Sequence, residues 1–270
     1  MNQELITRLE QGRLHDPFQL LGLHASADGR QEIRVWMPTA RQVRLDDGLM
    51  MRRVTDSGLF VLQPDAVQLA ALPQHYEVHW YDQDGNSYSQ VSPYSFDVLL
   101  GELDLYLFAE GQHWEIYQHL GARQTVIDGV SGVRFAVWAP SAERVSVVGD
   151  FNGWNGLRHP MRNRGGSGVW ELFMPGLQSG DNYKFEIRNS NSGDVFTKTD
   201  PYARAMELRP QTASLVFDSS YQWRDADWQQ QREEFAWNSQ PVSIYEVHLG
   251  SWQRDDAGGF LNYREIAHRL

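Results

Sequence analysis

The sequence predicts a mainly β protein with two tandem antiparallel β-sandwiches, followed by the opening of a βα unit. Three observations indicate this architecture. Short runs of alternating polar and apolar residues recur along the chain, separated by turn residues. One block of sequence occurs twice, which is typical of a duplicated domain. Near the end, a nearly continuous run of β-forming residues precedes a segment whose apolar residues have helical spacing.

Residues 1–100 are expected to form the first sandwich, preceded by a short helix. Leu5, Ile6 and Leu9 are spaced for one face of that helix. An Asp-Gly pair at 84–85 lies between two β-like runs and predicts a hairpin. The strands of this part are expected at residues 32–37, 42–45, 58–62, 76–81 and 87–91.

Residues 101–125 are expected to form a packed helical connector, because the segment is too apolar for a solvated linker. Residues 126–220 return to the strand pattern and predict the second sandwich. A linker helix is expected within residues 221–240. Residues 241–270 predict a strand buried on both faces, at 242–250, and then a helix. The strands of the second sandwich are expected at residues 134–138, 144–148, 168–174, 183–188, 195–198 and 214–217.

An internal repeat distinguishes residues that both sandwiches share from residues that occur in only one of them. Residues 34–45 match residues 136–147, with Trp36 at the position of Trp138. Features that two copies share are expected to be structural, so both tryptophans are expected in the cores. The turn Gly-Asp-Phe-Asn-Gly-Trp at 149–154 has no counterpart in the first copy. This turn is therefore the part of the second sandwich in which a function is expected.

Composition excludes several classes of partner. The net charge of −11 makes a nucleic acid or an anionic membrane surface an unsuitable partner. No apolar run approaches the roughly 18 residues that span a bilayer, and the first residues do not predict a signal peptide. The chain has no cysteine, which excludes disulfides and fits a reducing compartment. A cytoplasmic location is expected.

No catalytic residue, metal site or cofactor is predicted. The nine histidines show no metal spacing such as His-x-x-x-His on a helix. The sequence contains neither a Gly-x-Ser-x-Gly nucleophile elbow nor a phosphate-binding loop.

Trp154 is the principal candidate for a binding residue. A tryptophan directly after an Asn-Gly turn is expected at a loop tip, where its ring can stack on the apolar face of a sugar. The alternative is that the ring folds back on its own turn. Asn152 and Lys184 are candidate partners for sugar hydroxyls. Trp170 is a further candidate platform, although its strand context favours a core position.

Several motifs together resemble the N-terminal part of the bacterial 1,4-α-glucan (glycogen) branching enzymes of the α-amylase family. The resemblance covers essentially all 270 residues. The block Ile-Tyr-Glu-Val-His-Leu-Gly-Ser-Trp at 244–252, after a double sandwich, is the most specific of them. The others are His-Asp-Pro-Phe at 15–18, Leu-Gly-Leu-His at 21–24, Val-Trp-Ala-Pro at 137–140, the turn at 149–154, His-Pro-Met at 159–161, Gly-Val-Trp-Glu at 168–171, Tyr-Lys-Phe-Glu at 183–186 and Lys-Thr-Asp-Pro-Tyr-Ala at 198–203.

The resemblance implies an Ig-like N-terminal sandwich, a carbohydrate-binding module and the first βα unit of a (β/α)₈ barrel. It also implies an activity: an α-1,4 link in a glucan is cleaved and the chain is transferred to a C6 hydroxyl by retaining chemistry with two carboxylates. The family's catalytic motifs lie on later barrel strands and have no matching position here. By the resemblance the chain should bind and position glucan, pack on the rest of a barrel, and be inactive alone.

Two other functions remain open from the sequence. One is a free-standing glucan-binding or regulatory protein. The other is part of a related debranching enzyme or trehalohydrolase, because those relatives share the module with the turn at 149–154.

Overall fold

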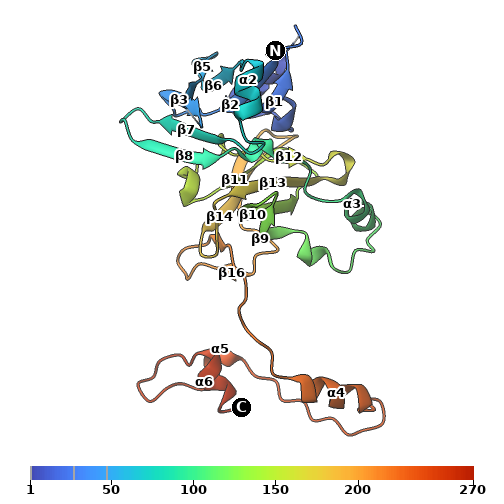
Figure 1. Cartoon of the computed structure of the whole chain (residues 1–270). Helices are drawn as coiled ribbons and strands as arrows, with labels where there is room; N and C mark the ends of the chain where they lie inside the picture. The colour runs from blue at the N-terminus through green and yellow to red at the C-terminus, as the bar shows by residue number, and fades with distance from the viewer. Residues whose placement is uncertain (1, 27, 47) are drawn as a thin grey trace. The chain divides into compact units, whose positions relative to one another are not determined.

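The computed structural model describes residues 2–26, 28–46 and 48–270, and the chain divides into two compact units, Met1–Ser219 and Ser220–Leu270 (Figure 1). The described residues form four antiparallel sheets, all within the first unit. The prediction of a mainly β protein built from antiparallel sheets is therefore confirmed.

The first sandwich contains two four-stranded sheets, with the strand orders β1-β2-β6-β5 and β4-β3-β7-β8. Every expected strand is present to within one residue at its ends, and the Asp-Gly hairpin joins β7 to β8. Strands β1, β4 and β5 were not expected. β4 and β5 contain only two residues each, too few to show alternation. The elements are α1 (Gln3–Glu10), η1 (Pro17–Gln19), β1 (Gly22–Ala25), β2 (Gln31–Trp36), β3 (Gln42–Leu45), β4 (Leu49–Met50), β5 (Arg52–Arg53), β6 (Leu59–Leu62), α2 (Ala66–Ala71), β7 (Glu77–Tyr81), β8 (Ser87–Val91) and η2 (Pro93–Ser95).

The second sandwich pairs a sheet of order β12-β13-β10-β9 with a sheet centred on β14. β14 pairs with β11 on one side and with β17 and β15 on the other. The expected strands are again present, while β9, β12 and β16 were not expected. The elements are β9 (Gly121–Ile127), β10 (Val130–Trp138), β11 (Ala142–Val148), η4 (Asp150–Asn152), β12 (Arg162–Asn163), η5 (Gly165–Ser167), β13 (Val169–Pro175), β14 (Asn182–Asn189), β15 (Val195–Lys198), β16 (Ala205–Met206) and β17 (Ser214–Leu215).

The two sandwiches repeat one topology, in agreement with the internal repeat. The order β9-β10-β13-β12 follows β1-β2-β6-β5, and β11-β14-β15 follows β3-β7-β8. Even a backbone detail recurs. Gly22 and Gly121 begin β1 and β9 with φ of +93° and +87°, and each faces a tyrosine carbonyl oxygen, that of Tyr94 or Tyr202. Both tyrosines come from the matched Pro-Tyr segments, so the duplication preserved this close approach.

The Gly22 position predicts a stability effect. A Cβ atom there would lie 2.5 Å from the carbonyl oxygen of Tyr94, in a backbone conformation that side chains disfavour. Gly22→Ala is expected to lower the free energy of unfolding by about 2 kcal/mol, measured by urea denaturation. Gly176→Ala is the matched control, because its φ is +80° and a Cβ there would meet nothing within 4 Å. It should cost about 1 kcal/mol, and equal losses would contradict the role given to the Tyr94 contact.

The cores explain how the two sandwiches hold together. One buried cluster contains the interior of the second sandwich, with Val133, Phe135 and Phe185, and also side chains from α1 and Trp36 of the first. A separate cluster fills the first sandwich. Burying these side chains contributes about 1.5–3 kcal/mol each, so the shared cluster fixes one sandwich on the other.

The segment between the sandwiches is packed rather than free. It contains α3 (Glu102–Ala109) and η3 (Ile116–Gln118). Leu100, Leu105 and Leu120 are buried in one cluster with Ala136 and Val169 of the second sandwich.

The second unit lacks the strand that the sequence predicts. It contains α4 (Ala226–Glu234), α5 (Leu249–Trp252) and α6 (Tyr263–Ala267). The expected helices are present, but no described strand pairs with residues 242–250, and Ile244 is 88% exposed. A strand is held by hydrogen bonds to neighbouring strands, so an apolar run without such a neighbour does not form one.

Asn262 caps α6 through a capping box with Glu265.

None of the helices in the described residues is both long enough and apolar enough to cross a membrane.

Candidate functional site

The turn after β11 is stabilised by its own backbone and by Asn152. The chain forms η4 and then reverses at Gly153 and Trp154, whose φ angles are +63° and +58°. The backbone N–H of Trp154 donates to the carbonyl of Gly149. The left-handed residues are thus Gly153 and Trp154 rather than an Asn-Gly pair, since Asn152 lies within η4.

Trp154 is held at the surface in a fixed orientation. The residue is 39% exposed. Its Nε1 donates a hydrogen bond to Oδ1 of Asp150 at 2.7 Å. Asp150 is itself held by Asn182 on β14, whose Nδ2 donates to Oδ2 of Asp150 at 2.8 Å. The indole N–H is therefore bonded within its own turn, while a large part of the residue stays open to solvent.

Lys184 lies on the strand that holds Asp150. It is two residues beyond Asn182 on β14, so both side chains project from the same face of the sheet. Its Nζ donates to Oγ1 of Thr212 at 2.8 Å. A chain of hydrogen bonds from Trp154 through Asp150 to Asn182 thus ends beside Lys184.

Asn152 was expected to bond sugar hydroxyls, but the structure buries it, so this expectation is wrong. The residue is 2% exposed, and its Oδ1 accepts from the N–H of Gly149. Its Nδ2 donates to the carbonyl of Val147 and lies 2.9 Å from Nδ1 of His159. Its amide is fully used in building the turn, so it positions Trp154 and has no free group for a sugar.

Of the other tryptophans, Trp170 lies in the core that its strand context favours, whereas Trp138 does not lie in the core as expected. Trp170 is 1% exposed and donates through Nε1 to the carbonyl of Ala139, so it is a core residue and offers no platform. Trp138, expected in the core, is 54% exposed and contacts Phe108 of α3 edge-on. Trp36 is buried as expected, because it donates to the carbonyl of Leu157 where the sandwiches meet. Matching positions of a repeat differ when their neighbours differ.

A cleft of about 980 Å³ adjoins the turn. Residues 150–153 line one side of it, and the β7–β8 hairpin of the first sandwich lines the other. On that hairpin Tyr88 is 45% exposed and stacks on Trp80 with a centroid separation of 5.5 Å. Sequence reasoning missed this surface because it treated the first copy as scaffold. The aromatic pair on one hairpin was the available signal.

Two carboxyl groups, those of Asp82 and Asp200, have shifted pKa values that bear on general-acid chemistry. In the cleft, the Asn86 amide is the main cause that lowers the pKa of Asp82 below its usual value. A catalytic acid needs the opposite shift. Burial raises the pKa of Asp200, but this residue is 4% exposed and accepts hydrogen bonds from Tyr183 and Tyr202. Asp200 is therefore enclosed.

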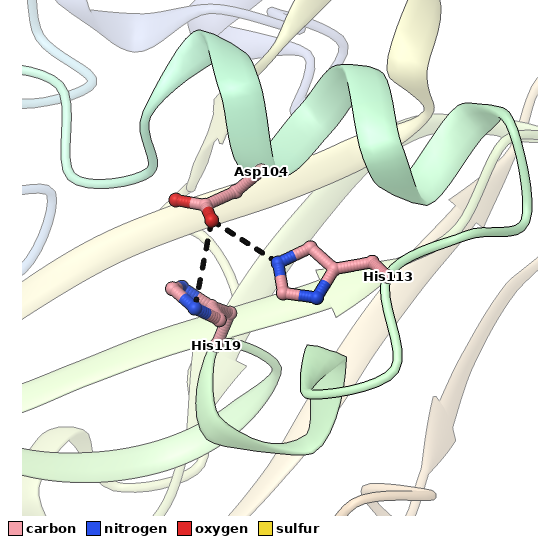
Figure 2. Close-up of side chains that lie close together, drawn as sticks. All are labelled: Asp104, His113 and His119. Carbon is pink, nitrogen blue, oxygen red and sulfur yellow. Dashed lines mark hydrogen bonds and ion pairs between the residues drawn. The ribbon is translucent and has the colours of Figure 1, made fainter.

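One group of side chains could hold a metal ion. Asp104 of α3, His113 of the following loop and His119 at the end of η3 converge, with ligand atoms within 4.8 Å of one another (Figure 2). A search for histidine pairs along one helix cannot find this group, because its members come from three places in the connector.

Comparison with known families identifies the two sandwiches separately. The family "Carbohydrate-binding module 48 (Isoamylase N-terminal domain)" matches residues 119–203. The family "alpha-1,4-glucan branching enzyme GlgB, N-terminal domain" matches residues 2–94. The fold and these matches define a class of protein, one in which a branching-enzyme N-terminal domain precedes a carbohydrate-binding module.

Individual proteins that match this chain over almost all of its residues are more specific. The chain is 56% identical over 270 residues to the 1,4-alpha-glucan branching enzyme GlgB of Hydrogenovibrio crunogenus, covering 100% of this chain and 37% of that protein. It is 51% identical over 265 residues to the enzyme of the same name from Methylococcus capsulatus, covering 97% and 35%. The chain belongs to the 1,4-alpha-glucan branching enzyme GlgB family and corresponds to its N-terminal part.

Among solved structures, an apo pullulanase from Klebsiella pneumoniae is similar at 20% identity, with a TM-score of 0.32. The similarity covers 76% of this chain and 24% of the pullulanase. A TM-score this low carries no argument about fold or function.

Proposed function

We propose that this chain binds α-glucan, such as glycogen or linear 1,4-glucan chains, and that Trp154 supplies the main stacking surface. The supporting observation is an exposed indole whose orientation is fixed by Asp150 and Asn182. A ring that is already oriented loses little conformational freedom on binding, so stacking on a sugar retains most of its gain. The match to a carbohydrate-binding module family over residues 119–203 supports the same ligand class.

The cleft extends this proposed surface towards the first sandwich. Tyr88 has one face on Trp80, and the residue remains 45% exposed on the other side of the cleft from Asp150. Asp82 orients the tyrosine by accepting a hydrogen bond from its hydroxyl group at 3.1 Å. Lys184 and the cleft carboxylates are proposed to meet sugar hydroxyls, since charged groups form the stronger hydrogen bonds.

The proposal for the full-length protein follows from family membership. We propose that it forms α-1,6 branches in glycogen by retaining transfer of a glucan chain, and that it is cytoplasmic. Residues 1–100 and 121–220 are then the two sandwich domains. The connector that joins them is shorter than the predicted 101–125 and ends at residue 120, because β9 begins at Gly121. A linker helix at 221–240 leads to residues 241–270, which would open the catalytic barrel and pack on it. No residue of the present chain is assigned a catalytic role, and we expect no branching by it.

Trp154→Ala is expected to weaken glucan binding about tenfold, because the loss of one stacking ring costs roughly 1–1.5 kcal/mol. Native electrophoresis of the 270-residue chain in gels that contain graded glycogen measures this directly, as a change in the apparent dissociation constant. Tyr88→Ala tests the cleft in the same gels and is expected to have a smaller effect in the same direction.

Trp114→Ala is the matched control, because this tryptophan is 91% exposed but lies on the connector loop, away from the turn. The Trp114→Ala variant should be retarded in the glycogen gels as much as the unmodified chain is. Equal retardation of the unmodified chain and Trp154→Ala would show that glucan is bound elsewhere on this chain. Failure of the unmodified chain to be retarded would remove the proposed function itself.

A further inference from the structure

Two of the distances within the Asp104, His113 and His119 group are close to those of a metal site. Nε2 of His113 lies 3.1 Å from Oδ1 of Asp104, and Nε2 of His119 lies 3.6 Å from the same oxygen (Figure 2). Zinc binds imidazole nitrogen and carboxylate oxygen at about 2.0–2.2 Å, so ligand atoms of a tetrahedral site lie about 3.3 Å apart. The two observed distances lie on either side of this value, and the ligand atoms of all three residues lie within 4.8 Å of one another.

The ligand types narrow the choice of ion. Two imidazoles and one carboxylate suit zinc, whereas magnesium and calcium prefer shells composed of oxygen ligands. The other charged side chains that act on His119 are Glu115, which is negative, and Arg134, which is positive. These two offset each other, so the charge of Asp104 remains to attract a cation.

The imidazole of His119 is weakly held from outside the group. Its Nδ1 is buried and has no hydrogen-bond partner among the described residues. Its ring meets that of His113 at a centroid distance of 4.9 Å. An ion at Nε2 of His119 would add a strong contact on the side of the ring that faces Asp104, although it would leave Nδ1 as it is.

We propose that Asp104, His113 and His119 bind one zinc ion, with a water molecule completing the tetrahedral shell. The ion would join α3 to the loop that follows it and to the residue that ends η3, immediately before β9. Since Leu105 and Leu120 of this segment are buried against the second sandwich, zinc would brace the connector in its packed position. The role is structural and independent of the glucan surface.

Isothermal titration of the EDTA-treated 270-residue chain with zinc chloride tests the proposal. The expected result is one zinc ion per chain, and a melting temperature that rises with zinc concentration. His113→Ala and His119→Ala should each weaken binding by about 100-fold, at least as much as is usual for losing a group that supports a ligand. Cobalt(II) should give the visible absorption of a four-coordinate site in the unmodified chain and not in these variants.

Two further variants make the result decisive. Asp104→Asn keeps the size of the side chain and removes its charge, so it should weaken zinc binding even if the alanine variants fold poorly. His79→Ala removes a histidine that lies 3.4 Å from a carboxylate, that of Glu77, without a third ligand, and zinc binding should be unchanged. Absence of stoichiometric binding, or equal losses in His79→Ala and His113→Ala, would overturn the proposed site.

Discussion

Replacing Arg144 with methionine is expected to lower the free energy of unfolding by about 3–5 kcal/mol, the usual loss when one partner of a buried ion pair is removed. Arg144 is 3% exposed. Its Nη2 donates to Oε1 of Glu186 at 2.6 Å, and its Nε donates to the carbonyl of Gly12 at 2.8 Å. Its Nη1 donates to Ser146 and to the carbonyl of Gly156. Methionine fills similar space and leaves all four acceptors without this donor.

The position of Arg144 explains why the expected loss is so large. Gly12 follows α1 of the first sandwich, Gly156 follows the turn at Trp154, and Glu186 lies on β14. One guanidinium therefore ties the first sandwich, the candidate binding turn and the central strand of the second sandwich. Its loss should loosen the junction between the sandwiches as well as one strand. Urea denaturation at neutral pH, followed by circular dichroism, measures the effect.

Arg13→Met is the matched control for Arg144→Met. Arg13 also donates to a carboxylate, that of Glu143 at 2.9 Å, but its side chain is 50% exposed. Exposed pairs contribute about 0–1 kcal/mol, so a small loss is expected. Replacing both Arg144 and Glu186 with apolar residues should recover part of the stability, because no unpaired carboxylate then remains. Similar losses in the two single variants would contradict the role given to burial.

The sequence predicted those features that depend on local pattern. Alternation located most of the longer strands, although not β1 or β9, and the turn residues after residue 148 located Trp154. The repeat located the shared topology of the two sandwiches. These features are predictable because period-two alternation and turn residues act over a few neighbouring positions.

Features that depend on distant neighbours could not be predicted in this way. Trp138 is exposed although its copy Trp36 is buried, because only Trp36 lies where the two sandwiches meet. The side-chain amide of Asn152 contacts Val147 and His159. The residue pattern of the turn does not indicate these contacts. The run at 242–250 has strand composition, but a strand also requires partners. Composition supplies the propensity, and the neighbours decide the outcome.

Stability is expected to fall by about 2 kcal/mol between pH 6.5 and pH 5, because of His159. Burial, with a smaller effect from the positive charge of Arg158, lowers the pKa of His159 to about 3. In the unfolded chain this imidazole binds a proton at its ordinary pKa of 6.5, while in the folded chain it stays neutral until the pH is close to 3. Stability is therefore fully present above pH 6.5 and is lost as the pH falls towards 3. Each pH unit in this window costs about 1.4 kcal/mol.

The same proton would disturb the candidate binding turn. Nδ2 of Asn152 can only donate, so Nδ1 of His159, 2.9 Å away, is the accepting nitrogen in the neutral imidazole. Protonation at Nδ1 would set two donors against each other and break the contact that holds Asn152 in place. Since Asn152 also bonds Gly149 and Val147, acid should loosen the turn that presents Trp154.

His159→Gln separates this residue from other groups that titrate. Glutamine offers an oxygen to the Asn152 amide and carries no proton in this range, so the free energy of unfolding of this variant should fall clearly less between pH 6.5 and 5 than that of the unmodified chain. Part of the fall should remain, because burial also lowers the pKa of His119. His79→Gln is the matched control, since it removes a histidine from β7 and should keep the slope of the unmodified chain. Urea denaturation of the three proteins across this range gives the slopes. A His159→Gln slope equal to the unmodified one would show that other groups cause the acid sensitivity.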